Sequence, residues 1–134
     1  MGTAPASGKR SSRPRLATLK RRTEFQRVRK GARWATPAFV LEARARGEGQ
    51  DEHAAGTPRF GFTVTRQVGK AVERNRIRRR LKAAVREAGL SHARSDFDYV
   101  LIARRPALTS AYQVLAASLV EALRRVHRPA GRGR

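Results

Sequence analysis

A dense group of cations near the middle of the chain is the strongest chemical signal in the sequence. Seven basic residues fall between positions 74 and 86 with no acid among them: Arg74, Arg76, Arg78, Arg79, Arg80, Lys82 and Arg86. At a helical advance of about 100° per residue, an apolar seam of Ile77, Leu81, Ala84, Val85 and Ala88 lies opposite Asn75, Arg79, Lys82 and Arg86. A solvated helix face normally mixes both signs, whereas these cations repel one another. The segment therefore predicts a helix that rests on a core and offers its outer face to a polyanion, with simple solvation as the alternative.

The composition of the whole chain indicates the same kind of partner. The sequence has 31 Lys and Arg against 10 Asp and Glu, a formal net charge of +21. Such an excess is typical of proteins that bind nucleic acid. An anionic membrane surface is the competing partner. It is disfavoured because no segment reaches the roughly 18 apolar residues of a spanning helix, and because the basic helix carries small aliphatic residues in place of Trp, Phe and Leu.

The acidic and histidine residues show no pattern that predicts catalysis by the protein. Three of the ten carboxylates lie in the Gly-containing stretch 47–58. The other seven are scattered, without a paired-carboxylate or nucleophile motif: Glu24, Glu42, Glu73, Glu87, Asp96, Asp98 and Glu121. The histidines His53, His92 and His127 lack the spacing of metal ligands and are interpreted as loop or surface residues. We expect no catalytic residue and no metal ligand, and the absence of cysteine fits a reducing cytoplasm.

The length of 134 residues predicts one domain with one core. Residues 1–14 and 128–134 are rich in Gly, Pro, Arg and small residues, and we expect them to be disordered basic tails around a folded region at 15–127. The first segment contains no acid, so an organelle transit peptide is an alternative interpretation of it. A basic arm that contacts RNA is the preferred one.

Local patterns predict the first half of the folded region. Thr23 and Gln26 form a candidate capping box for a short helix that ends before Gly31. Apolar and polar residues then alternate at 38–44 and again at 60–64, which indicates two strands that pair antiparallel with each other. The stretch 47–58 between them is interpreted as a solvated hairpin loop.

The second half alternates helix and strand. A polar turn at 66–70 leads into the basic helix, which breaks at Gly89. Residues 97–103 form a nearly continuous apolar run, which predicts a strand covered on both faces. Pro106 ends that strand, and Thr109 or Ser110 is expected to cap a last helix with apolar residues at helical spacing. The predicted order is helix, strand, strand, helix, strand, helix.

This order and several segments resemble the protein subunit of bacterial ribonuclease P. The resemblance is carried by Glu-Phe-Gln-Arg-Val at 24–28, Phe-Gly-Phe-Thr-Val at 60–64, Gly-Lys-Ala-Val-Glu-Arg-Asn-Arg-Ile at 69–77, and Asp-Tyr-Val-Leu-Ile-Ala-Arg at 98–104. It extends from about Leu16 to Val126. The resemblance implies an α+β sandwich with a small mixed sheet, similar to the second domain of ribosomal protein S5. Its strand-helix-strand crossover is implied to be left-handed, against the general right-handed preference.

The resemblance also implies a function. The catalytic component of that enzyme is an RNA that removes the 5′ leader of precursor tRNA with hydrated Mg²⁺. The protein binds this RNA and the leader and lowers the magnesium requirement. We therefore expect the catalytic RNA and precursor tRNA as partners, no obligate protein partner, no membrane and a cytoplasmic location. The alternatives are a ribosomal or other structural RNA-binding protein without a processing role, and a metal-dependent nuclease.

The implied site residues form two groups. Those that match the RNA-binding element or the turn before it are Arg66, Lys70, Arg74, Asn75, Arg76, Arg78, Arg79, Arg80, Lys82 and Arg86. Arginine can bridge phosphates with two parallel hydrogen bonds, and the start of a helix favours phosphate. For Arg80 and Arg86, the alternatives are helix solubility or an ion pair with an acid such as Glu87.

The second group is the implied leader-binding cleft, which consists of Phe25, Arg29, Val40 and Glu42. A base stacked on an aromatic ring contributes about 1 to 3 kcal/mol, so Phe25 is the expected stacking residue, with a core position as the alternative. Arg29 and Glu42 replace aromatic residues of some relatives, which predicts a smaller part for stacking. Trp34 either compensates for them or packs against the fold.

Overall fold

The central strands lie where the sequence predicts them. The structure, a computed structural model, describes residues 16–47 and 56–128. Its strands are β1 (Ala17–Thr18), β2 (Ala32–Ala35), β3 (Phe39–Ala45), β4 (Arg59–Thr63) and β5 (Phe97–Ala103). They form one mixed sheet in the order β1-β4-β5-β3-β2. The predicted tail 1–14, the predicted tail 128–134 except for Arg128, and most of the 47–58 loop lie outside the described residues.

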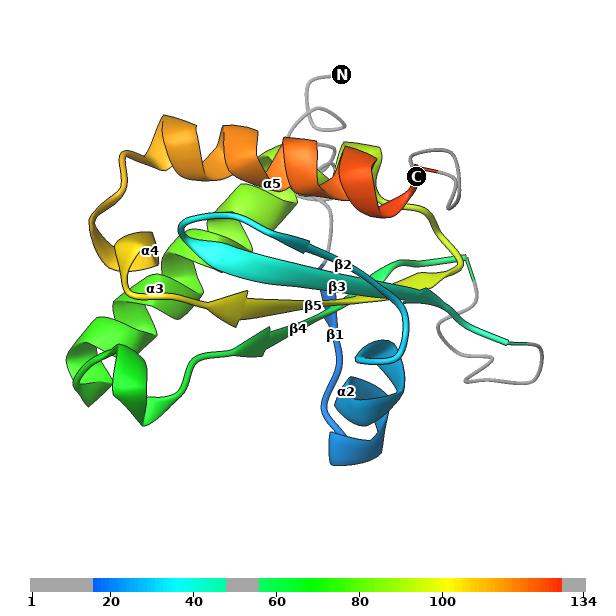
Figure 1. The fold of residues 1–134 in the computed structure, drawn as a ribbon, viewed down its shortest axis with the longest axis horizontal. Coiled ribbons are helices and arrows are strands. Elements are labelled where there is room, and N and C mark those ends of the chain that lie inside the picture. Colours follow the sequence, from blue (N-terminus) through cyan, green and yellow to red (C-terminus); the bar gives the residue numbers. More distant parts are fainter. Residues whose placement is uncertain (1–15, 48–55, 129–134) are drawn as a thin grey trace, which may run out of the picture.

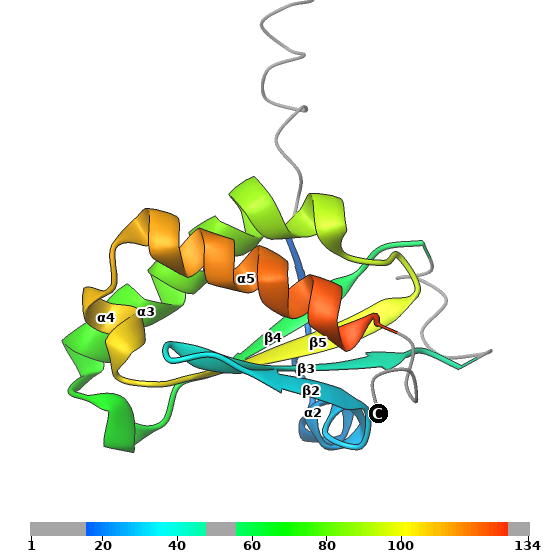
Figure 2. The ribbon, with the colours of Figure 1, turned by 45° about the horizontal axis from the view of Figure 1, so that its top comes forward.

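Helices lie on both sides of this sheet (Figure 1). They are α2 (Arg22–Val28), α3 (Ala71–Ala84), α4 (Pro106–Thr109) and α5 (Tyr112–Val126). The short segments η2 (Arg66–Val68), η3 (Val85–Gly89) and η4 (Leu90–His92) complete the described chain, and η3 continues α3 as one π-helical turn. Figure 2 shows α3 and α5 on one face of the sheet and α2 on the other. Within the described ranges, no helix is long and apolar enough to cross a membrane.

The predicted pairing of the first two main strands is wrong. β5 lies between them: Leu41 of β3 is opposite Leu101 in antiparallel pairing, and Phe60 of β4 is opposite Tyr99 in parallel pairing. The most continuously apolar strand takes the centre of the sheet, where α3 and α5 cover one face and α2 covers the other. β4, α3 and β5 thus form a crossover between parallel neighbours, and Figures 1 and 2 together show the implied left-handed connection.

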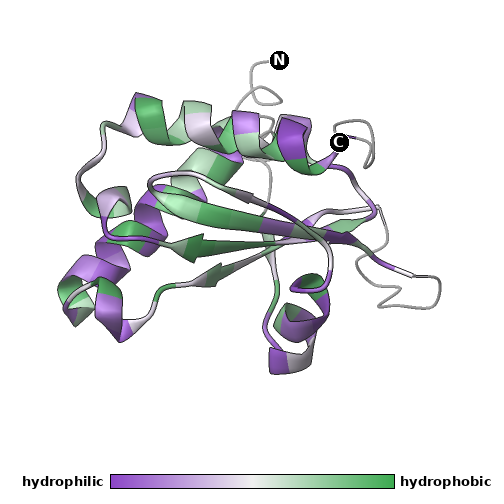
Figure 3. Ribbon diagram, in the orientation of Figure 1, coloured by the Kyte–Doolittle hydropathy of each residue, from purple (hydrophilic) through white to green (hydrophobic). Residues whose placement is uncertain are grey.

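Two apolar clusters hold the layers together. The main cluster lies between the sheet and α3 and α5, and includes Phe39, Leu41 and Tyr99, each fully buried. A smaller cluster on the other face joins Val28 of α2 to Val100 of β5. Figure 3 shows that hydrophilic and hydrophobic residues alternate along α3. The single predicted core is therefore accompanied by a second, smaller one under α2.

Both predicted helix caps are wrong. At α2, the Glu24 carboxylate accepts hydrogen bonds from the N–H groups of Lys20 and Arg21, at 2.9 and 3.0 Å, so the cap lies two residues before Thr23. At α5, the helix starts at Tyr112 without a side-chain cap. The Ser110 hydroxyl instead donates to the Pro106 carbonyl, at 2.6 Å, where the short α4 ends. The Glu24 carboxylate accepts hydrogen bonds from two backbone N–H groups at once. The Thr23 hydroxyl lies inside the first turn of α2 and does not take this role.

Candidate nucleic-acid interface

The basic helix α3 is held to the protein along its apolar seam. Ile77, Leu81 and Ala84 are at most 1 % exposed, and Val85 extends the buried seam into η3. At the start of α3, Glu73 accepts a hydrogen bond from the Lys70 N–H at 2.9 Å and pairs with Arg105 at 2.9 Å. Hydrogen bonds from Arg105 and from the Lys70 N–H lower the pKa of Glu73 to about 2. The helix is therefore fixed at its first turn and along its inner side.

The outer side of α3 presents cations to solvent, as the sequence predicts. Asn75, Arg76, Arg79 and Arg86 are exposed. Within the part of the chain that the structure describes, none of the α3 cations forms an ion pair with a carboxylate. Glu87, which the sequence offered as a partner for Arg86, instead accepts a hydrogen bond from the Tyr112 hydroxyl at 2.6 Å. The positive charge of this face is thus left without an internal counterion.

Three α3 arginines donate to the protein itself. Arg74 donates to the Gly69 carbonyl at 3.2 Å, and Arg78 to the Asn75 side chain at 2.9 Å. Arg80 donates to the carbonyl of Ser110 before α5, and its Nε is buried. Arg80 therefore links α3 to the segment between α4 and α5. Arg80 can therefore make its predicted contact with RNA only through the part of its side chain that remains accessible.

The turn before α3 places the remaining two predicted cations beside the same helix end. Arg66 in η2 and Lys70 before α3 are both exposed. Arg105 donates to the Val68 carbonyl at 2.8 Å and so fixes this turn against the end of β5. Because Glu73 already uses the Lys70 N–H, a phosphate here would meet the side chains of Arg66 and Lys70 more readily than that backbone group.

The predicted cleft residues share the sheet face that α2 covers in part. Side chains alternate along β3, so Val40 and Glu42 point away from the main core that holds Phe39, Leu41 and Ala43. Both are nearly inaccessible, with Val40 4 % and Glu42 2 % exposed. Arg29 is exposed at the end of α2. The structure therefore leaves Arg29, and not Val40 or Glu42, open to a ligand on this face.

Phe25 is half-buried and combines the two roles that the sequence left open. It packs against the small cluster that contains Val28 and Val100. A Cβ atom on Gly61 would lie 2.5 Å from its Cε2 atom, so the ring lies directly on the β4 backbone. Glycine at position 61 is required for this close approach. The ring is thus held in place by packing while part of it stays accessible.

One cation near the cleft, Arg33, was not singled out from the sequence. Arg33 in β2 has a side chain that is 58 % exposed, and it binds Glu42 at 3.0 Å. Trp34, its neighbour, faces the opposite side of the sheet, where the Arg125 guanidinium lies 4.8 Å from its ring centroid. Trp34 therefore packs beside α5 and does not compensate for missing aromatic residues in the cleft. Arg33 is an exposed cation on the cleft side in addition to Arg29.

A buried ion cluster at one end of the sheet was also missed. Asp98 in β5 is fully buried and accepts hydrogen bonds from Arg27 at 2.6 Å, Arg46 at 2.7 Å and Arg59 at 2.8 Å. Burial favours a raised pKa for Asp98, but the hydrogen bonds from Arg59 and Arg46 outweigh it and hold the pKa below its usual value. The available signal was an acid inside an otherwise apolar strand, which requires buried cationic partners.

His127 departs from its predicted surface role. Its Nε2 lies 2.6 Å from the Tyr99 hydroxyl, and its ring meets Phe97 edge-on with centroids 4.5 Å apart. Burial lowers the pKa of His127, and the charge of Arg94 adds to this effect. The histidine therefore helps to hold the end of α5 against β5.

Comparisons with known proteins agree on one family. Residues 14–127 match the model of the family described as Ribonuclease P. The ribonuclease P protein component of Brucella suis is 46 % identical over 112 residues, which cover 81 % of this chain and 78 % of the relative. The corresponding protein of Paramagnetospirillum magneticum is 44 % identical over 113 residues, 84 % of each chain.

Solved structures show the same fold. The RNase P protein of Staphylococcus aureus superposes with a TM-score of 0.67 at 26 % identity, covering 84 % of this chain and 97 % of that one. The RNase P protein of Thermotoga maritima gives a TM-score of 0.67 at 23 % identity, over 83 % and 98 % of the two chains. At this second level of identity the likeness concerns the fold alone.

Proposed function

The chain belongs to the ribonuclease P protein family, and from this premise we propose that it docks the outer face of α3 on the ribonuclease P RNA and binds the 5′ leader of precursor tRNA beside Phe25. As a member of that family, it is a protein component of a tRNA-processing ribonucleoprotein. The observation that carries the proposal is the exposed face of α3, whose cations have no carboxylate partner among the described residues. RNA supplies the missing counterions as a regular series of phosphates.

The leader-binding part of the proposal rests on the sheet face beside α2. Phe25 is fixed on Gly61 by packing and still half-accessible, so a base can stack on its ring at little cost in side-chain entropy. Arg29 and Arg33 lie exposed on nearby elements and supply cations for the backbone of a single strand. Stacking and backbone contacts tolerate different bases, which suits leaders of variable sequence.

Chemistry is assigned to the RNA partner. Among the described carboxylates, five are engaged by arginines, which leaves them poorly suited to act as general bases or to bind a metal ion. These are Glu24, Glu42, Glu73, Asp98 and Glu121. We therefore assign Mg²⁺ to the RNA, where the protein's cations reduce the repulsion between RNA and substrate and so lower the magnesium requirement. The proposal places this assembly in the cytoplasm and requires no further protein.

Reconstitution tests the proposed function. Transcribed ribonuclease P RNA is combined with this protein, and cleavage of precursor tRNA is followed as magnesium is lowered. We expect cleavage at magnesium concentrations where the RNA alone is inactive, and no cleavage by the protein without RNA. Substrates with a normal and a one-nucleotide leader should differ in affinity only when the protein is present. Equal rates with and without protein would favour a structural RNA-binding role instead.

A further inference from the structure

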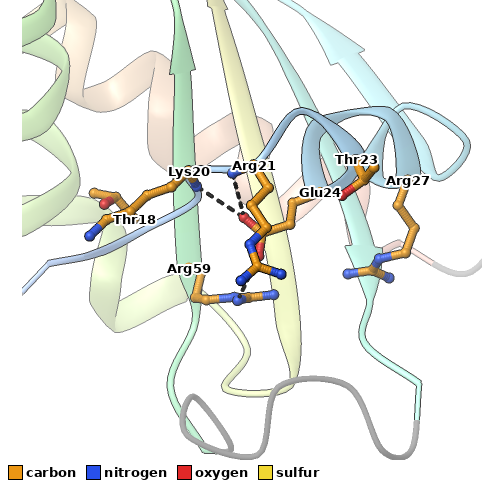
Figure 4. A pocket seen from close by; sticks show the side chains of 7 residues that line it. All are labelled: Thr18, Lys20, Arg21, Thr23, Glu24, Arg27 and Arg59. Carbon is orange, nitrogen blue, oxygen red and sulfur yellow. Dashed lines mark hydrogen bonds and ion pairs between the residues drawn. The ribbon is translucent and has the colours of Figure 1, made fainter.

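A cationic hollow lies at the opposite end of β4 from the basic helix. It has a volume of about 630 Å³ and is lined by Thr18, Lys20, Arg21, Thr23, Glu24, Arg27 and Arg59. Figure 4 shows these side chains gathered between the start of α2 and the first residue of β4. Because β4 ends at Thr63 and leads from there toward α3, this hollow is separate from the outer face of α3.

The charges around the hollow do not balance. Four of its lining side chains are basic and one is acidic. The acid, Glu24, already accepts hydrogen bonds from the N–H groups of Lys20 and Arg21 and pairs with Arg59 at 3.3 Å. Arg27 and Arg59 also share Asp98 with Arg46. Two carboxylates, Glu24 and Asp98, therefore already face three arginines. Lys20 and Arg21 add two further positive charges.

Lys20 and Arg21 supply the excess charge. Both residues are exposed, and within the described residues neither side chain forms an ion pair. Arg21 and Arg59 both line the hollow beside Glu24, and the Arg59 side chain is only 7 % exposed. Two like charges near a partly desolvated site repel more strongly than they would in bulk water. An anion between them would turn this repulsion into attraction.

We propose that the hollow is a binding site for a phosphate group of the RNA backbone. A guanidinium binds phosphate oxygens with two parallel hydrogen bonds, and the Lys20 ammonium adds a mobile point charge. The hydroxyls of Thr18 and Thr23 are further donors in the lining. The backbone N–H groups of Lys20 and Arg21 are used by Glu24, so the side chains have to hold the phosphate. The arrangement of these side chains alone supports a phosphate site. That the phosphate belongs to RNA rests on the proposed function.

NMR of the full-length protein tests the proposal. Arginine Nε–Hε signals are followed while the protein is titrated separately with inorganic phosphate and with a five-nucleotide single-stranded RNA. We expect both probes to shift the Arg21 and Arg59 signals. The variant Lys20→Ala/Arg21→Ala should bind each probe about tenfold more weakly at this site. The slope of log affinity against log salt for the RNA should become shallower by about 0.7, the value for one phosphate of a single strand.

A matched control removes the same charge elsewhere. Arg22→Ala/Arg124→Ala removes two exposed arginines that do not line the hollow, and we expect it to leave the Arg59 response unchanged. Thermal melting of both variants checks that they fold. Shifts confined to α3 arginines such as Arg76 and Arg79, or equal losses in both variants, would overturn the site. A response to inorganic phosphate without one to RNA would overturn RNA as the source. Reconstituted cleavage of precursor tRNA remains a separate measurement, so failure of the hollow and failure of the proposed function are distinguishable.

Discussion

Removing Arg76 and Arg79 together tests whether the outer face of α3 meets RNA phosphates. Both side chains are exposed, and neither makes a hydrogen bond or ion pair with the described part of the protein. Ile77, which lies between them in sequence, is buried and stays in place. The double variant Arg76→Ala/Arg79→Ala therefore removes two charges without disturbing the seam that holds the helix. Exposed sites of this kind usually change the free energy of unfolding by about 0.5 kcal/mol or less.

The size of the effect follows from the number of phosphates neutralised. Four cations of α3 and η3 donate to no group in the described residues: Arg76, Arg79, Lys82 and Arg86. With about 0.7 to 0.9 counterions released per phosphate, they give a slope of log affinity against log salt of about −3 to −4. The slope for the double variant should be shallower by about 1.4 to 1.8. Over a rise from about 50 to about 200 mM salt, the wild-type protein should lose about tenfold more affinity than the variant.

Fluorescence anisotropy with labelled ribonuclease P RNA measures this slope. Arg124→Ala/Arg128→Ala is the control, because it removes the same charge from exposed positions near the end of α5. An equal change of slope in the control would show that net charge, and not the α3 face, determines binding. An unchanged slope in the double variant would refute the phosphate contacts. Loss of the circular dichroism signal would show that these arginines are structural.

Three further substitutions test the contacts that hold the site in place. Asp98→Asn removes the buried negative charge that Arg27, Arg46 and Arg59 share and should lower the free energy of unfolding by about 3 to 5 kcal/mol in urea titrations. Because the folded-state pKa of Asp98 lies below its usual value of 3.8, the stability that its charge contributes is present above about pH 4 and is lost as the pH falls further, so wild type and variant should converge only in acid. Gly61→Ala places a Cβ atom 2.5 Å from the Phe25 ring and should lower both the urea midpoint and leader affinity, whereas an unchanged midpoint would show that the ring is free to move. Glu73→Gln weakens the pair with Arg105, so its melting temperature should fall below that of wild type at neutral pH and meet it only near pH 2, where Glu73 itself becomes protonated.

The elements that the sequence predicts well are those with a strong local pattern. Three such patterns are the alternation in β3, the apolar run of β5 and the seam of α3. Each arises because one element packs against the core, and the spacing of apolar residues within that element indicates the packing. β2 was missed because its four residues are all exposed at the edge of the sheet, so no hydrophobic alternation marks it. β1 has only two residues, too few for any period to appear.

Partners distant in sequence explain the errors. The order of β3, β5 and β4 depends on which of the three strands buries most apolar surface when it lies at the centre of the sheet. The hydrophobic pattern of one strand does not show how its burial compares with that of another strand. Arg80 was grouped with the RNA-binding cations because its link to the Ser110 carbonyl spans 30 residues. The three arginines on Asp98 are 39 to 71 residues away from it, although the acid itself marked the strand as unusual.

The distribution of charge gives salt two opposite effects on this protein. The described acids that bind arginines do so away from the outer face of α3, so the cations of that face repel one another in the free protein. Added salt screens exposed like charges, with a Debye length of about 10 Å at 0.1 M, and screens the buried Asp98 cluster much less. Salt should therefore raise the melting temperature of the free protein over the range in which it weakens RNA binding, while the double variant at Arg76 and Arg79 should gain less from it. Differential scanning calorimetry at increasing NaCl measures this. A melting temperature that falls with salt would show that the attraction of the ion pairs outweighs the repulsion along α3, and the unneutralised face would then no longer account for the binding of RNA.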